Sequence, residues 1–106
     1  MEVKQCCVKY CHQYPLYYSL GSQIASARVK GFQGLDLSSP NTVAACAKHF
    51  AAYGFAEAGR DYNTVDIGDN TLHNIVLPPF KAATEAGVKT LRKTTLTFTK
   101  LYQIVM

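Results

Sequence analysis

The stretch Thr42-Val43-Ala44-Ala45-Cys46-Ala47, just after Pro40, decides the fold class. It is short and apolar, and its residues do not alternate between apolar and polar. Such a run is typical of a strand that is covered on both faces, as strands of parallel sheets are. We therefore expect a buried strand here that leads directly into Lys48 and His49.

A helical pattern precedes this strand. Apolar residues at helical spacing predict a helix over residues 19–32, with Ser19 as its N-cap and Gly31 and Gly34 as its stop. A Gly- and Ala-rich loop over residues 51–66 follows the strand.

A second helical pattern follows the loop and opens at Asp66, Gly68 or Asp69. Pro78-Pro79 should break or kink it, because an interior proline lacks an N–H and clashes one turn back. A further short helix over residues 80–86 should then end at Gly87. The order of helix, strand, long loop and helix predicts an α/β fold built from βα units.

The length of the chain limits how much of such a fold it holds. Its 106 residues suffice for one small domain but fall short of the roughly 250 that a closed (β/α)8 barrel needs. The net charge is +4 over residues 89–106, +1 over residues 1–18 and −1 over residues 19–88. This uneven charge indicates no nucleic-acid partner, since no basic stripe with aromatic residues runs through the middle.

No membrane or secretion signal is evident in the sequence. No run approaches the ~20 apolar residues of a membrane span, so we expect no membrane partner. Residues 1–18 lack the pattern of a signal peptide, and the location of the protein stays open.

The cysteines allow one alternative reading from a different class of protein. Cys6, Cys7, Cys11 and His12 carry ligand types that suit zinc, with Cys46 or His49 as a more distant ligand. Their spacing is not that of a zinc knuckle, so we expect free thiols, no metal and no cofactor. Phosphate-loop, dinucleotide-binding and nucleophile-elbow motifs are absent from the sequence.

Lys48 and His49 are the candidate binding residues. The carboxyl end of a parallel strand is the edge at which α/β proteins bind ligands. Lysine offers three hydrogen-bond donors and histidine donates or accepts, which suits adjacent hydroxyls of a sugar ring. Taken alone, the dipeptide is more often a solvated lysine beside an ordinary loop histidine.

Several strings around the pair favour the binding interpretation. They are Leu20-Gly21-Ser22, Val29-Lys30-Gly31-Phe32-Gln33-Gly34, Ala47-Lys48-His49-Phe50, Tyr53-Gly54, Glu57-Ala58-Gly59-Arg60-Asp61-Tyr62-Asn63-Thr64-Val65-Asp66 and Leu77-Pro78-Pro79-Phe80-Lys81-Ala82. In this order and spacing they resemble the N-terminal catalytic domain of family 3 glycoside hydrolases, above all bacterial, often periplasmic, β-glucosidases. The resemblance covers about residues 19–88 and leaves the segments 1–18 and 89–106 unmatched.

The resemblance implies a partial (β/α)8 barrel of one or two βα units with irregular ends. It implies a retaining hydrolase of terminal β-D-glucosyl residues, with a β-glucoside or oligosaccharide as substrate. Lys48 and His49 would bind sugar hydroxyls, with non-proline cis peptide bonds around them. Arg60, Asp61 and Tyr62 would lie on a loop at the pocket rim, where Arg60 and Asp61 could instead pair with each other.

The sequence also departs from the family pattern. Retaining hydrolysis needs two carboxyl groups, and the family's nucleophile is an aspartate usually followed by tryptophan, which this chain lacks. Glu57 and Asp61 form no matched pair, and Asp66 and Asp69 suit helix starts. We therefore expect no catalysis by this chain alone.

The loss of pattern at both ends suggests a truncated gene or a wrong reading frame, which translation of the flanking DNA would test. A second alternative is a non-catalytic fragment that binds sugar or a partner weakly. Unclosed barrel edges would favour self-association of such a fragment.

Overall fold

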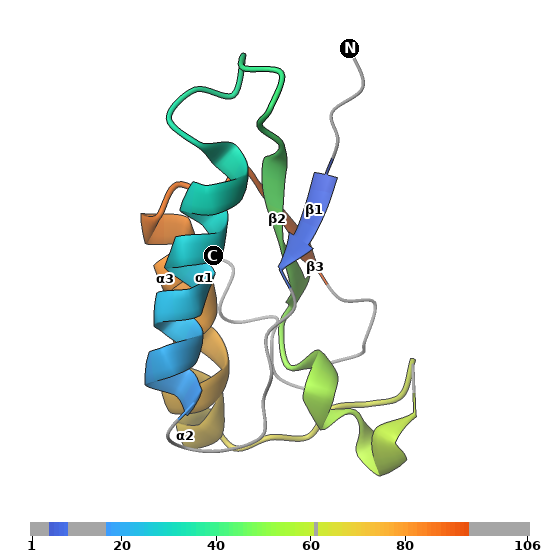
Figure 1. The fold of residues 1–106 in the computed structure, drawn as a ribbon. Coiled ribbons are helices and arrows are strands. Elements are labelled where there is room, and N and C mark those ends of the chain that lie inside the picture. Colours follow the sequence, from blue (N-terminus) through green and yellow to red (C-terminus); the bar gives the residue numbers. More distant parts are fainter. Residues whose placement is uncertain (1–4, 9–16, 61, 94–106) are drawn as a thin grey trace, which may run out of the picture.

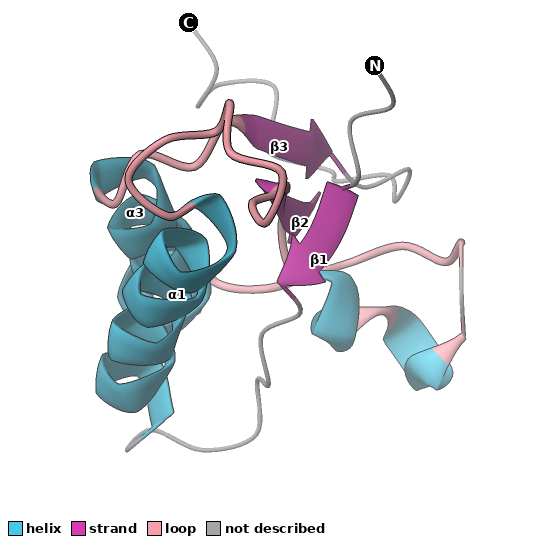
Figure 2. Ribbon diagram, turned by 45° about the horizontal axis from the view of Figure 1, so that its top comes forward, coloured by secondary structure: helices cyan, strands magenta, loops and turns pink. Residues whose placement is uncertain are grey.

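The computed structural model describes residues 5–8, 17–60 and 62–93, with side chains from residue 19 onward. A three-stranded parallel sheet forms one layer, in the order β1 (Gln5–Val8), β2 (Ala44–Phe50) and β3 (Thr90–Lys93). Helices α1 (Tyr17–Gln33) and α3 (Leu77–Glu85) cover one face of this sheet (Figures 1 and 2). The predicted α/β class with one or two βα units is confirmed.

The central strand β2 begins two residues later and ends three residues later than its apolar pattern predicts. It begins at Ala44 instead of Thr42 and continues beyond Ala47 to Phe50. The strand is longer because main-chain pairing with its neighbours does not depend on apolar side chains. The first four residues of β2 are buried, as expected for a strand covered on both faces.

The outer strands come from the two end segments that the quoted family motifs leave unmatched, residues 1–18 and 89–106. Gln5 pairs with Ala44 and Cys46 pairs with Thr90, so both partners lie parallel to β2. Short peptides of this kind form strands when a neighbouring strand satisfies their N–H and C=O groups. In the described sheet β1 and β3 are the two edges, and self-association through them stays a prediction.

The core lies between the sheet and the two helices. Ala45 and Ala47 of β2 belong to the buried cluster that includes Val29 of α1 and Phe80 of α3. The rings of Phe50 and Phe80 meet edge to face, with centroids 5.2 Å apart and planes at 87°. Alanines on the strand let the helices approach closely, and the two phenylalanines fill the space near the strand's carboxyl end.

Helix α1 begins at Tyr17, so the predicted N-cap Ser19 lies inside the helix. Boundaries read from sequence commonly miss by one or two residues. Gly34 ends the helix as predicted: its φ is +58°, and its N–H donates to the Lys30 carbonyl at 2.9 Å. Gly31 was also predicted as part of the stop but is an interior residue of α1.

The second helical pattern is one irregular helix, because α2 (Asp69–Thr71) continues through a π turn (Leu72–Val76) into α3. Of the break or kink predicted at Pro78-Pro79, the break is wrong, because the helix continues through both prolines. The Leu77 N–H reaches back to the Leu72 carbonyl, which widens the turn just before two prolines that can donate no N–H. The π turn replaces the break.

The ends of this helix match two of the predictions. Gly68 is the N-cap and Asp69 the first helical residue, whereas Asp66 lies outside the helix. At the other end Gly87 has φ +83°, its N–H donates to the Thr84 carbonyl, and the Val88 N–H donates to the Ala83 carbonyl. These two bonds form a Schellman motif, so the predicted cap is confirmed.

Asp36, in the link between α1 and β2, makes the stability of this link depend on pH. Its carboxylate accepts hydrogen bonds from the Ser38 hydroxyl at 2.6 Å and the Ser38 N–H at 2.9 Å, and these bonds lower the pKa of Asp36. A lowered pKa adds stability above the ordinary value of about 3.9, and this stability is lost as the pH falls through the lowered pKa. Asp36→Asn should therefore destabilise the protein at pH 7, and the difference should shrink as the pH falls through the lowered pKa of Asp36. Thermal unfolding of both proteins across pH checks this; a difference independent of pH would contradict it.

Among the described helices, none is both long and apolar enough to span a lipid bilayer.

Candidate functional site

Lys48 and His49 lie among the last three residues of β2, at the carboxyl end of the parallel sheet. Both side chains are half-buried, unlike the four fully buried residues before them. Lys48 lies opposite Arg92 of β3, and the register between β2 and β3 then shifts at His49, so that Phe50 lies opposite Lys93. Lys48 is thus held by the sheet, while His49 lies at an irregularity of the strand between Lys48 and Phe50.

The two faces of β2 differ in what covers them. Ala45 and Ala47 face the helices, because both belong to the core cluster built with α1 and α3. Side chains alternate along a strand, so Ala44, Cys46 and Lys48 lie on the opposite face. In a (β/α) barrel this opposite face is the interior. Lys48 therefore lies at the ligand-binding end of what would be the inner face.

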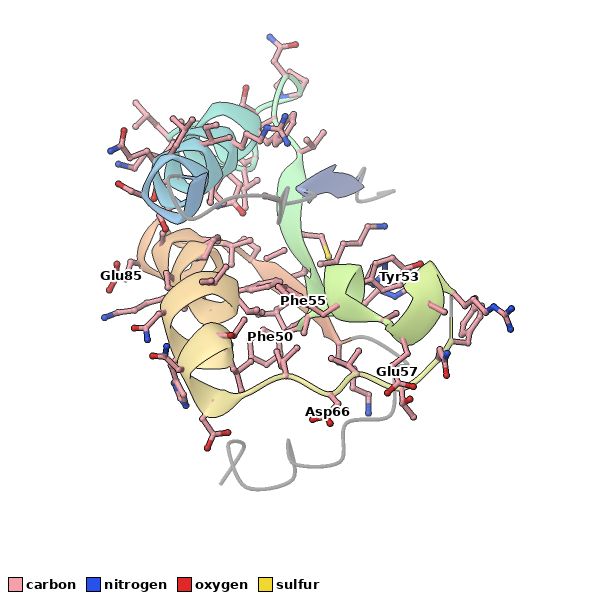
Figure 3. All side chains as sticks on the ribbon, turned by 90° about the horizontal axis from the view of Figure 1, so that it is seen from below. Phe50, Tyr53, Phe55, Glu57, Asp66 and Glu85 are labelled. Atoms are coloured by element: carbon pink, nitrogen blue, oxygen red, sulfur yellow. The ribbon has the colours of Figure 1, made fainter. Side chains whose placement is uncertain are left out.

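His49 packs against an aromatic neighbour. Its ring centroid lies 5.3 Å from that of Tyr53, with the two planes tilted by 40°. Tyr53 opens a 3-10 turn (Tyr53–Phe55) directly after the strand, and Figure 3 shows its ring beside this turn. The peptide bonds Lys48–His49 and Phe50–Ala51 are cis, as the family resemblance implied.

The predicted rim loop is closed by its own hydrogen bonds. The Glu57 N–H donates to the Thr64 carbonyl at 3.0 Å, and the Thr64 hydroxyl donates to the Glu57 carboxylate at 2.8 Å. Arg60 and Tyr62 lie between these anchors and are exposed, Tyr62 by 83%. Asp61, and with it the predicted pair with Arg60, lies outside the described residues.

Two of the three described carboxylates considered for catalysis, Glu57 and Asp69, have a structural role in their own segment. Glu57 bonds to Thr64, and Asp69 opens α2, where a carboxylate interacts favourably with the first turn. Asp66 was expected to start the helix but lies ahead of it and is exposed, because Gly68 takes the N-cap position. Figure 3 shows Glu85 on the helix side of the molecule, away from Glu57. Glu85 pairs with Lys81 at 3.8 Å.

Two of the surface hollows among the described residues are lined by neither Lys48 nor His49. A hollow of about 640 Å³ lies between α3 and β3 and is lined by Phe50, His73, Leu77, Pro78, Phe80, Lys81, Thr84 and Leu91. A second, of about 480 Å³, lies between α1 and α3 and is lined by Ser22, Gln23, Ser26, Ala27, Lys30 and Ala82. The position of Lys48 and His49 at the end of β2 defines this candidate site.

The metal-binding alternative is not tested by the structure. Within the described residues, no three His, Cys, Asp or Glu side chains gather as a metal site would require. Cys46 is a buried free thiol. Cys6 and Cys7 lie in β1, whose side chains are not described, and Cys11 and His12 lie outside the described residues.

The class of protein follows from comparison with known families. Residues 17–103 match the glycosyl hydrolase family 3 N-terminal domain, so the chain belongs to this family. The match extends past residue 88, where the motifs quoted from the sequence end.

Individual relatives narrow this class toward β-glucosidases. The periplasmic β-glucosidase of Salmonella typhimurium is 43% identical over 68 residues, which is 64% of this chain and 9% of that protein. The structure of a β-glucosidase from Listeria innocua superimposes with a TM-score of 0.68 at 41% identity, covering 73% of this chain and 11% of its own. An exo-1,3/1,4-β-glucanase from Pseudoalteromonas shares the fold with a TM-score of 0.74 at 21% identity, covering 90% of this chain and 14% of its own. The chain thus spans roughly a tenth of the length of the proteins it resembles.

Two residues near the pair were not predicted as site residues from the sequence. Tyr53 stood in a family motif, but its packing against His49 had no signal in the sequence. Arg92 lies beside Lys48 only because of the register between β2 and β3. A register between strands more than forty residues apart cannot be read from periodicity, since it is set by the packing of the helix between them.

Proposed function

We propose that this chain supplies the sugar-binding edge of a retaining β-glucosidase barrel. Lys48 and His49 hydrogen-bond to hydroxyls of a terminal β-D-glucosyl residue, and the loop with Arg60, Asp61 and Tyr62 borders the pocket. The observation that carries the proposal is the position of Lys48: the carboxyl end of a parallel strand, on the face away from the helices.

The chemistry of the pair fits a sugar ring. The Lys48 ammonium has three donors for adjacent hydroxyls, and the His49 imidazole can donate or accept. Tyr53 restricts the His49 ring, so less side-chain freedom is lost when a sugar binds. The β-glucosidase from Listeria innocua has been crystallised in complex with glucose, and a mutant of it in complex with laminaribiose. These complexes support a β-glucosyl ligand for the present chain.

In our proposal this chain does not supply the two carboxyl groups that catalysis requires. A retaining glycosidase places two carboxyls about 5–5.5 Å apart, one as nucleophile and one as acid/base. Glu57 is bonded within its own loop and Asp69 lies at a helix start. The nucleophile and the acid/base would therefore come from residues beyond those of this chain, and the chain alone binds without turning over substrate.

Replacing Lys48 tests the binding half of the proposal. Hydrogen bonds to a charged group contribute about 1.5–3 kcal/mol, so Lys48→Met should weaken D-glucose binding at least tenfold. NMR titration of the ¹⁵N-labelled full chain measures this. Lys30→Met removes the same charge from the exposed surface of α1 and should leave binding unchanged. Equal affinities of the wild type and Lys48→Met would refute the assignment.

A turnover assay tests the catalytic half separately. The purified chain, incubated with p-nitrophenyl β-D-glucoside, should release no more nitrophenol than buffer does. Clear turnover that is lost in Glu57→Gln would show that the chain does carry a catalytic carboxyl.

A further inference from the structure

A second cation lies next to Lys48. The parallel register of β2 and β3 pairs Lys48 with Arg92 and Ala47 with Leu91. Paired residues of neighbouring strands lie on the same face of a sheet. Leu91 lines the hollow on the helix side together with Phe80, and Ala47 is in the helix-side core. Arg92 and Lys48 therefore share the opposite face, where the sugar would bind.

This arrangement is unfavourable unless an anion is nearby. Like charges directly opposite each other on neighbouring strands destabilise a sheet. In the part of the chain that the structure describes, the ion pair present joins Lys81 and Glu85 on α3, and no carboxylate pairs with Lys48 or Arg92. Arg92 is exposed and Lys48 half-buried, so a ligand at this face meets both cations.

We propose that Lys48 and Arg92 together select a gluco-configured sugar that carries an acidic group, a carboxylate or a phosphate. This inference rests on the proposed sugar-binding function and names its substrate class. Lys48 donates to a ring hydroxyl, while the planar guanidinium of Arg92 takes the anionic oxygens in a bidentate contact. A neutral glucoside leaves the Arg92 guanidinium without an anionic partner and binds less tightly.

The neighbouring residue Lys93 provides a matched control. It follows Arg92 along β3 and so lies on the other face, and it pairs with Phe50, whose ring packs on Phe80 beneath the helices. Lys93→Gln and Arg92→Gln remove the same charge from the same strand. They differ in the face from which the charge is lost.

Parallel titrations of the full chain with D-glucuronate, D-glucose 6-phosphate and D-glucose test the inference. The wild type should bind each acidic sugar about tenfold more tightly than D-glucose. Arg92→Gln should bring this ratio close to one, whereas Lys93→Gln should keep the ratio. Arg92→Lys retains the charge without the bidentate geometry and should give an intermediate ratio. A preference for only one of the two acidic sugars identifies which anion the site takes.

Other outcomes separate this inference from the proposed function. Suppose that D-glucose binding depends on Lys48 but the wild type shows no preference for acidic sugars, or that Arg92→Gln keeps the wild-type preference. In either case the inference is overturned and the proposed function stands. If no sugar binds the folded wild type, both are overturned. Inorganic phosphate should compete with D-glucuronate in the wild type and in Lys93→Gln but not in Arg92→Gln; equal competition in all three would show a general charge effect and overturn the inference.

Discussion

Replacing Gln33 by alanine is expected to destabilise the protein by about 2–4 kcal/mol, because this one side chain satisfies three main-chain groups. Gln33 is the last residue of α1 and only 7% exposed. Its Oε1 accepts from the Ala45 N–H at 3.3 Å and the Lys89 N–H at 3.0 Å, and its Nε2 donates to the Gly87 carbonyl at 2.9 Å. Alanine would leave the buried Ala45 N–H without its acceptor and cut the link between α1 and the approach to β3.

Urea unfolding followed by circular dichroism measures this effect. Gln23→Ala is the matched control, since Gln23 is exposed on the same helix and its loss should change stability by less than about 0.5 kcal/mol. Gln33→Glu keeps an acceptor for the two N–H groups but cannot donate to Gly87, so it should fall between the wild type and Gln33→Ala. Equal losses in Gln33→Ala and Gln23→Ala would show that the three bonds contribute nothing to stability.

Replacing Gly34 by alanine is expected to cost about 2 kcal/mol, for two independent reasons. Gly34 has φ +58°, a conformation that costs an ordinary residue roughly 1–2 kcal/mol. A Cβ added there would lie 2.9 Å from Cγ2 of Thr42, closer than such atoms normally approach. Thr42 is held in place by bonds from its hydroxyl to the Asp36 and Ser39 carbonyls, so it cannot easily move away.

Gly31→Ala provides a control of opposite sign. Gly31 lies in the interior of α1, and a Cβ added there would meet no atom within 4 Å. Alanine should therefore stabilise the helix by about 0.5–1 kcal/mol. Thermal unfolding of both variants measures the contrast, and a stabilising Gly34→Ala would contradict the strain at the cap.

These two positions connect stability to the candidate site. Gly34 ends α1 and turns the chain toward β2, while Gln33 holds the first residues of β2 against α1. Lys48 and His49 lie at the other end of that strand. The placement of Lys48 and His49, the proposed sugar-binding pair, therefore depends on residues near the opposite end of β2.

Much of the candidate site could be predicted from local sequence. The run of small apolar residues before Lys48 indicated a buried strand, and the family motifs implied both the role of the pair and its cis peptide bonds. Gly34 and Gly87 were readable as helix ends because positive φ is a local requirement. The π turn before Pro78 could not be predicted from the sequence, because a proline excludes a regular helical turn but does not specify what replaces it.

The sequence by itself determined the α/β class, the family, the buried strand and the identity of the pair at its end, since these depend on short-range patterns and on residue chemistry. Only the tertiary structure decided that residues 5–8 and 90–93 pair with β2, that Gln33 is buried, and that Arg92 lies beside Lys48. Each of these depends on main-chain groups from distant segments meeting across the sheet, and a hydrogen bond of that kind leaves no period in the sequence.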